Sequence, residues 1–171
     1  MARPPQDHPL IAQIPHLRRY ARALMGDRAM ADDLVQDCLE RAWSRFHLWR
    51  EGSNLRTWLF TIMHNLHANA VRSATRRPAT VPVDAPGVIA PTRPAQEDGL
   101  EVASIDAALA QLPEDQRQVI LLVGLEGMSY QEAAASLGVP IGTVMSRLHR
   151  GRERLRQILA AAGGPTLRRV K

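Results

Sequence analysis

The chain is poor in cysteine and in aromatic residues, and both shortages exclude classes of protein. Cys38 is the single cysteine among 171 residues, so neither an internal disulfide nor a zinc site with two cysteine ligands is possible. Aromatic residues make up 4% of the chain, and alanine and leucine dominate its apolar residues. This composition favours helices packed on helices over β-sandwiches, which need β-branched and aromatic side chains.

Long apolar runs are also missing. No apolar run approaches the ~18 residues that a membrane span requires. The first residues, Met1 to Asp7, contain prolines and lack the apolar core of a signal peptide. We therefore expect a cytoplasmic protein without membrane insertion.

Acidic residues are scarce near the C-terminus. The whole chain has 22 Lys+Arg against 17 Asp+Glu, a net charge of +5. From Arg147 onward, Glu153 is the one acidic residue among these basic ones: Arg147, Arg150, Arg152, Arg154, Arg156, Arg168, Arg169 and Lys171. A local basic excess predicts a polyanionic partner, and the alternative is an ordinary solvated helix end and tail.

Proline content divides the chain into two helical blocks. Residues 73–99 contain Pro78, Pro82, Pro86, Pro91 and Pro94, which block helix formation and indicate a semi-extended linker. We predict an all-α fold of two small helical domains, residues 10–72 and 100–162, with a frayed tail over 163–171. Each block has only about sixty residues, a size that is marginally stable alone.

Apolar periodicity predicts where the helices lie. The expected ranges are 14–25, 30–46, 55–72, 102–111, 113–125, 130–137 and 141–160. Ser129 and Glu132 form a capping-box pattern before the sixth range, and Gly138 ends it. In the second range, polar residues at 33, 36, 37 and 40 fall opposite the apolar face.

A short capped helix, a glycine-containing turn and a basic helix form a helix-turn-helix pattern over residues 129–160. At about 100° per residue, Val144, Leu148, Gly151, Leu155 and Leu159 share the core face. The opposite face carries Gly142, Met145, Ser146, His149, Arg150 and Glu153, with Arg147, Arg152 and Arg154 at its flanks. We expect the outer face to contact bases and the flanking arginines to contact phosphates. The alternative is a three-helix core with a basic surface.

Five of the seven aromatic residues lie between Trp43 and Phe60, close to Arg41, Arg45, Arg50 and Arg56. Aromatic rings that stack on bases beside arginines that meet phosphates suit single-stranded nucleic acid. A flipped base also needs a small polar pocket, which Ser53, Asn54 and Asn65 could line. We interpret Trp43 and Phe46 as core residues, and Trp49 and Arg50 as functional.

These segments resemble the two conserved regions of a known family. Residues 31–37, 41–43, 55–62 and Asn65 resemble region 2 of bacterial extracytoplasmic-function (ECF) sigma factors. Residues 112–117, 129–134 and 142–148 resemble region 4 of the same family, in the family's order. The segment Thr57–Ile62 is similar to the general-stress subgroup.

The resemblance implies a dissociable promoter-specificity subunit of RNA polymerase, with no catalysis, cofactor, metal or small-molecule substrate. Its implied partners are core polymerase (the clamp helices of the largest subunit, and the flap), promoter DNA and an anti-sigma factor. The implied polymerase contacts are Asp33, Gln36, Asp37 and Glu40. The implied −10 contacts are Trp49, Arg50, Ser53, Asn54, Leu55, Arg56, Thr57, Trp58 and Asn65. The implied −35 contacts are Gly142, Thr143, Met145, Ser146, Arg147, His149, Arg150, Arg152 and Arg154.

One departure from the family and three rival interpretations stay open. Many members have Arg or Lys where this chain has Met145, a change that removes a guanine contact and favours a thymine methyl. A stand-alone helix-turn-helix regulator would explain residues 129–160 but not the polar face at 33–40. A polymerase-binding adaptor would leave the arginine-bearing helix unexplained. An enzyme would have to use Cys38, His64 and His67, which lack a recognisable catalytic partner.

Overall fold

The computed structural model describes residues 8–76 and 105–162. Those residues form helices and connecting turns, without a strand among them, which confirms the expected all-α class. The predicted linker spans residues 73–99, and its residues from 77 onward lie outside the described residues, as does the tail over 163–171.

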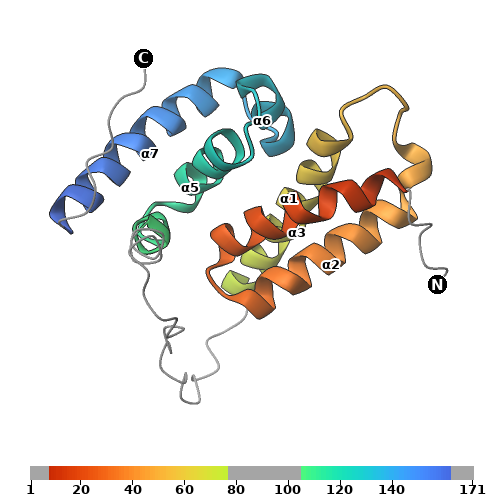
Figure 1. Cartoon of the computed structure of the whole chain (residues 1–171), viewed down its shortest axis with the longest axis horizontal. Coiled ribbons are helices and arrows are strands. Elements are labelled where there is room, and N and C mark those ends of the chain that lie inside the picture. The colour runs from red at the N-terminus through yellow and green to blue at the C-terminus, as the bar shows by residue number, and fades with distance from the viewer. Residues whose placement is uncertain (1–7, 77–104, 163–171) are drawn as a thin grey trace.

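The first half consists of three helices and a short 3-10 turn (Figure 1). They are α1 (Pro9–Met25), α2 (Arg28–Ser44), η1 (Phe46–Leu48) and α3 (Leu55–Arg76). Gly26 ends α1 at φ +70°, a left-handed conformation that glycine adopts without strain. Asp27 then caps α2, because its side chain accepts a 2.8 Å hydrogen bond from the Met30 N–H.

Both ends of this half differ from the prediction. Helix α1 begins at Pro9 rather than at residue 14, which brings Leu10 into the core and places Pro15 inside the helix. Helix α3 continues to Arg76, past the predicted linker start at 73. No proline occurs between Leu55 and Pro78, so nothing in that stretch interrupts the helix. A residue directly before a proline disfavours the helical conformation, which places the end of α3 close to Pro78.

The second half contains residues 105–110 as a helical turn, then α5 (Glu114–Ile120), α6 (Tyr130–Leu137) and α7 (Ile141–Ala161). The prediction of one helix over 113–125 was wrong in its last turn, which is the π-helical η2 (Leu121–Leu125). There the Glu126 N–H donates to the Leu121 carbonyl at 2.9 Å, five residues back. Such π-turns are rare and are frequently found at functional sites.

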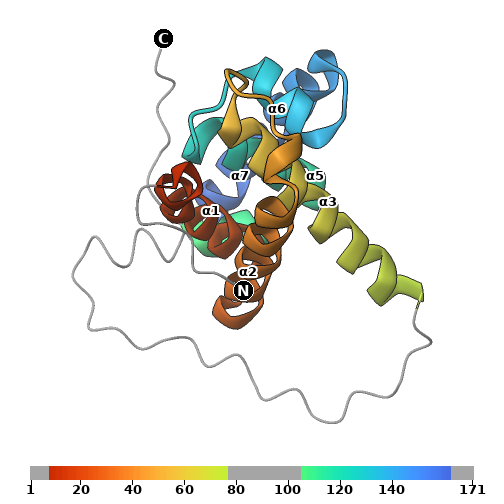
Figure 2. The same cartoon turned by 90° about the vertical axis from the view of Figure 1, so that its right-hand side faces the viewer.

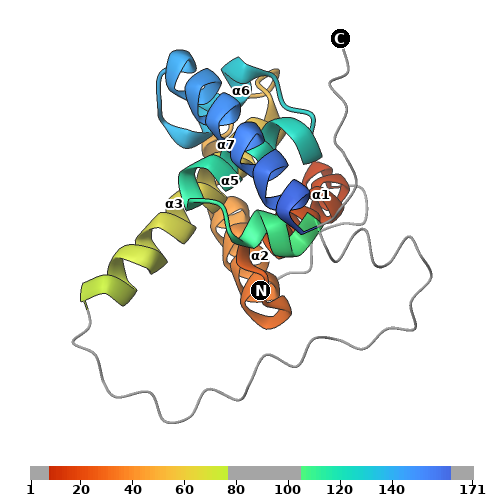
Figure 3. The ribbon, with the colours of Figure 1, turned by 90° about the vertical axis from the view of Figure 1, so that its left-hand side faces the viewer.

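The two halves pack against each other and share one apolar core. Helix α3 contacts α6, and α1 contacts η2, so segments from opposite ends of the chain lie side by side (Figures 1 and 2). The C-terminal turns of α3 project away from this bundle (Figures 2 and 3). The two domains predicted from the sequence are therefore docked in this structure.

Candidate nucleic-acid interface

The helix-turn-helix forms as its sequence predicts. The Ser129 side chain accepts a hydrogen bond from the Glu132 N–H at 3.2 Å, and Glu132 in turn accepts from the Ser129 N–H at 2.7 Å. Gly138 closes α6 at φ +65°. These two local features fix where α6 begins and ends and so set the direction in which α7 leaves the turn.

Helix α7 buries one face and exposes the other. Its buried residues are Val144, Leu148, Gly151, Leu155 and Leu159, which confirms the predicted core face. The opposite face is exposed at Gly142, Met145, Ser146, His149 and Arg150, and Met145 retains 50% of its surface. This helix therefore presents one thioether, one hydroxyl, one imidazole and one guanidinium group, all suited to contact with base edges.

The arginines beside this face differ in their surroundings. Arg152 and Arg154 are exposed. Arg147 is half-buried, and its Nε lies 3.1 Å from Asp115 Oδ2 on α5. Thr143 is also half-buried, in the first turn of the helix. Contact between Arg147 and a phosphate would therefore require this ion pair to open.

Four polar side chains on α2 form a solvent-exposed strip, as predicted: Asp33, Gln36, Asp37 and Glu40. Gln36 donates a 3.1 Å hydrogen bond to Glu40 one turn later. The buried face of the same helix is formed by Ala31, Leu34, Val35, Cys38 and Ala42. The exposed strip is thus available to a partner without any change in the core.

The aromatic segment is mostly packed. Trp43 and Phe46 lie against the core, as predicted, and the His8 ring contacts both. Trp49, predicted to be functional, is half-buried and stacks on Phe46 with ring centroids 5.4 Å apart. Arg50 is exposed, and its carbonyl accepts hydrogen bonds from the backbone and side chain of Ser53.

A hollow of about 400 Å³ lies where this loop meets α6. Its lining residues are Ser53, Asn54, Thr57, Trp58, Thr61, Gln131, Glu132 and Ala135. Ser53 and Asn54 are there as predicted, but Asn65 is exposed further along α3 and is not among the lining residues. Asn54 caps α3 by accepting a 3.2 Å bond from the Thr57 N–H, and it also donates to the Glu132 carboxylate.

A buried carboxylate that was not predicted from the sequence lies at the centre of the contact between the halves. The side chain of Glu126 has 0% exposure and is surrounded by His16, Arg19 and Arg56 of the first half. We call these four residues the Glu126 cluster. The Arg19 Nε donates to Glu126 Oε1 at 2.8 Å, and His16 Nδ1 lies 3.0 Å from Oε2. Arg56 donates to both the carboxylate and the backbone carbonyl of Glu126.

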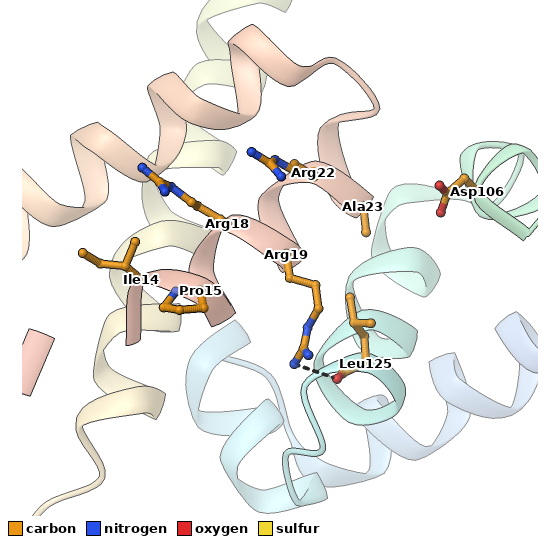
Figure 4. Close-up of a pocket in the computed structure, with 8 residues that line it drawn as sticks. All are labelled: Ile14, Pro15, Arg18, Arg19, Arg22, Ala23, Asp106 and Leu125. Atoms are coloured by element: carbon orange, nitrogen blue, oxygen red, sulfur yellow. Dashed lines mark hydrogen bonds between the residues drawn. The ribbon is translucent and has the colours of Figure 1, made fainter. Parts of the chain in front are cut away.

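Arg19 also holds the chain just before Glu126, donating a 3.2 Å hydrogen bond to the Leu125 carbonyl (Figure 4). This contact closes one side of a pocket of about 580 Å³ between α1 and the second half. Arg18 and Arg22 also line that pocket. In the sequence, Glu126 is an acidic residue directly after the apolar run 119–125, a position that does not by itself indicate burial.

The surroundings of Glu126 keep it charged. Burial acts to raise the pKa of its carboxyl group, but hydrogen bonds from Arg19, Arg56 and His16 outweigh burial and leave the pKa below its ordinary value. These hydrogen bonds replace the water that the Glu126 carboxylate loses when the two halves dock.

A second set of contacts joins α3 to α5. His67 Nε2 lies 2.7 Å from Glu114 Oε1, which also accepts a 2.9 Å bond from Gln118. His64, one turn before His67, has its Nδ1 buried without a hydrogen-bond partner in the described part of the chain. Burial, then the charge of His67, lowers the pKa of His64.

Two searches of the described residues bear on other classes of function. No group of three or more His, Cys, Asp or Glu side chains within residues 8–76 and 105–162 could hold a metal ion. None of the helices in those ranges is long and apolar enough to span a membrane.

Comparison with known proteins gives consistent matches in both halves. The family described as the sigma2 domain of PhyR matches residues 10–64, and the family described as sigma-70 region 4 matches residues 103–155. The chain is 41% identical over 157 residues to the ECF RNA polymerase sigma factor EcfG of Rhodopseudomonas palustris, covering 90% of this chain and 84% of that one.

Two solved structures share the arrangement of both halves. The sigma factor RpoE of Bartonella quintana, in complex with the anti-sigma factor NepR, is 38% identical with a TM-score of 0.76, over 88% of this chain and 94% of that one. CnrH, in complex with the cytosolic domain of CnrY, is 28% identical with a TM-score of 0.65, over 89% and 85%.

Proposed function

The chain belongs to the ECF RNA polymerase sigma factors, and we propose that its two halves divide promoter recognition between them. The first half binds core polymerase and opens the −10 element, and the second half reads the −35 element as a duplex. The observation that carries this division is that one chain exposes both an acidic strip on α2 and a basic reading face on α7. A stand-alone regulator needs only the second of these surfaces.

We assign polymerase binding to the α2 strip of Asp33, Gln36, Asp37 and Glu40. Exposed carboxylates on a rigid helix favour a basic partner surface, and their substitution leaves the core of α2 intact. The double variant Asp33→Asn/Asp37→Asn is expected to lose affinity for core polymerase. Asp32→Asn is the matched control, because Asp32 pairs with Arg22 and Arg28 inside the same half.

The −10 assignment places the unpaired strand along the start of α3. Its residues are Trp49, Arg50, Ser53, Asn54, Leu55, Arg56, Thr57, Trp58 and Asn65. Strand opening requires binding energy for the unpaired strand that exceeds the unstacking of a flipped base, a few kcal/mol. The hollow at Ser53 and Asn54 and the exposed Arg50 support this role.

Asn65 tests the −10 assignment, because it is exposed and can be changed without disturbing the core. Asn65→Ala is expected to weaken open-complex formation, measured by permanganate reactivity, while polymerase binding is unchanged. Asn69→Ala, one turn later on the same helix, is the control. An equal loss of polymerase binding and strand opening in Asn65→Ala would contradict the assignment.

The −35 assignment uses the exposed face of α7. The residues assigned to the bases are Gly142, Thr143, Met145, Ser146, His149 and Arg150. The residues assigned to phosphates are Arg147, Arg152 and Arg154. Arg150→Ala is expected to weaken binding to the −35 duplex by roughly 1–3 kcal/mol, the size of a bidentate base contact. Arg28→Ala removes the same charge from the first half and serves as control. Unchanged duplex affinity in Arg150→Ala would remove that residue from the reading face.

We also propose that an anti-sigma factor controls this chain in the cytoplasm as part of a stress response. Support comes from similarity to RpoE, whose structure contains the anti-sigma factor NepR, and from the segment Thr57–Ile62. Regulation by an anti-sigma factor predicts little transcription that depends on the chain in extracts of unstressed cells of its own host. Full activity in such extracts would contradict it.

Run-off transcription tests the whole proposal. Purified bacterial core polymerase is combined with genomic fragments of the source organism, with and without the chain. Specific transcripts that depend on the chain support the proposal, and their start sites identify the two promoter elements. Tight duplex binding without polymerase, in the absence of transcripts, would instead support a stand-alone helix-turn-helix regulator.

A further inference from the structure

The Glu126 cluster engages a side chain, Arg56, that the proposed −10 surface assigns to promoter DNA. Arg56 belongs to the proposed −10 surface, yet its guanidinium donates to the carboxylate and to the carbonyl of Glu126. It retains only 27% of its side-chain exposure. Because guanidinium groups bind carboxylates and phosphates with the same donor geometry, Glu126 stands where a DNA phosphate would bind.

Two further contacts join the proposed −10 surface to α6. The Asn54 side chain donates to Glu132 of α6, and the Ser136 hydroxyl donates to the Thr57 carbonyl at 3.2 Å. Asn54 and Thr57 both belong to the proposed −10 surface, and both line the hollow that α6 closes. The second half thus covers the start of α3 with two carboxylates, one of them fully buried.

We propose that the docked arrangement is a self-inhibited state of the free protein, in which Glu126 and Glu132 hold Arg56 and Asn54 in place of the unpaired promoter strand. The inference rests on the proposed −10 surface. Separation of the halves returns Glu126 to water and releases Arg56. An ion cluster of this kind suits a reversible contact, because its Coulombic attraction is largely offset by the desolvation of its members.

Loss of either Glu126 or Arg19 is expected to open the molecule. Glu126→Gln removes the negative charge that compensates Arg19 and Arg56, so the halves separate. Arg19→Gln removes two contacts across the interface, to Glu126 and to the Leu125 carbonyl, and Arg19 lies outside the proposed DNA surface. Arg19→Gln removes one positive charge, and this loss alone would weaken DNA binding. Release of the −10 surface instead predicts stronger DNA binding.

The experiment uses the full chain without polymerase. Small-angle X-ray scattering measures the radius of gyration, circular dichroism verifies helix content, and fluorescence anisotropy measures binding to labelled oligo(dT) of ~12 nucleotides. If the open state is about a tenth of the wild-type population, full opening raises the apparent affinity about tenfold. Asp32→Asn is the charge-matched control, because Asp32 is exposed and pairs with Arg22 and Arg28 within the first half, outside both proposed DNA surfaces.

The proposal is supported if Glu126→Gln and Arg19→Gln both expand the molecule and bind oligo(dT) about tenfold more tightly, while Asp32→Asn does neither. Adding Arg56→Ala to Glu126→Gln should remove the gain. An unchanged radius in both variants, or a gain no larger than that of Asp32→Asn, overturns the proposal. If Glu126→Gln fails to fold, Arg19→Gln decides the matter, because its side chain is about half exposed.

A transcription assay separates the two possible failures. If Arg56→Ala lowers open-complex formation but neither variant changes oligo(dT) affinity, the self-inhibition is wrong and the −10 surface stands. If Arg56→Ala leaves open-complex formation unchanged, the assignment of Arg56 to the −10 surface is wrong, and the inference falls with it.

Discussion

At the scale of single residues, the environment of Cys38 bears on the cysteine chemistry that an enzyme interpretation would need. Its side chain has 0% exposure, and its thiol donates to the Leu59 carbonyl at 3.5 Å. Burial, reinforced by the charge of Asp37, raises the pKa of Cys38 to about 12. Since the thiolate is the nucleophile, a thiol with this pKa is inert at neutral pH.

We therefore predict that Cys38 does not react in the folded protein. Incubation with iodoacetamide at pH 7.5 should leave the chain unmodified by mass spectrometry, whereas the same treatment in guanidinium chloride should add one carbamidomethyl group. The denatured sample is the internal control. Rapid modification without denaturant would show that α2 and α3 separate locally, and it would reopen the question of cysteine chemistry.

At the scale of helices, the crossing of α5 and α7 depends on one glycine. A Cβ atom added at Gly151 would lie 2.8 Å from Ile120 Cδ1 and 3.2 Å from Gln116 Cβ. The end of Ile120 can rotate away, but Gln116 Cβ is fixed to the backbone of α5. Gly151 is thus a point of close approach between the reading helix and α5.

Gly151→Ala is expected to lower the free energy of unfolding by about 1 kcal/mol. Overpacking typically destabilises by about 1–3 kcal/mol, and alanine restores about 0.5–1 kcal/mol of helix preference. Gly142→Ala is the matched control in the same helix, because a Cβ atom at position 142 meets nothing within 4 Å. That variant should be as stable as the wild type or more stable. Urea denaturation measures both, and equal stabilities would show that α5 moves to accept the methyl group.

Helix positions were largely predictable because their signals are local. The capping box at Ser129 and Glu132, with Gly138 at the end, located α6 to the residue, and the periodicity of α7 identified its five buried residues. The π-turn η2 was not predictable, because its run of apolar residues is also compatible with a regular helix. The candidate surfaces on α2 and α7 followed from the same periodicity.

At the scale of the whole molecule, the docking of the halves could not be read from the sequence. Glu126 is 107 residues from Arg19 and 70 from Arg56, so no spacing rule connects them. Before folding, Glu126 resembles any acidic residue at a helix end, and the proline-rich segment indicates independence of the halves rather than contact. Long-range pairing of buried charges depends on the tertiary arrangement that brings them together.

The interface between the halves also contains a titratable group that favours its neutral form. His64 of α3 faces His67 on its own helix, Glu114 and Gln118 of α5, and Arg147 of α7. Burial, the charge of His67 and that of Arg147 lower the pKa of His64, outweighing Glu114 and a hydrogen bond with Gln118. Its ordinary value is 6.5, so the unfolded chain binds this proton at a higher pH than the folded chain does.

The free energy of unfolding must therefore fall as the pH decreases below about 6.5, by less than about 1.4 kcal/mol per pH unit for this one group. His64→Gln should remove this contribution, so the stability difference between wild type and variant should shift in favour of the variant between pH 7.5 and pH 5.5. His47→Gln, at an exposed position in η1, is the control for a histidine outside the interface. Urea denaturation at the two pH values measures the shift. A difference between wild type and His64→Gln that is the same at both pH values would mean that His64 binds its proton equally well in the folded and the unfolded chain, which would contradict the prediction.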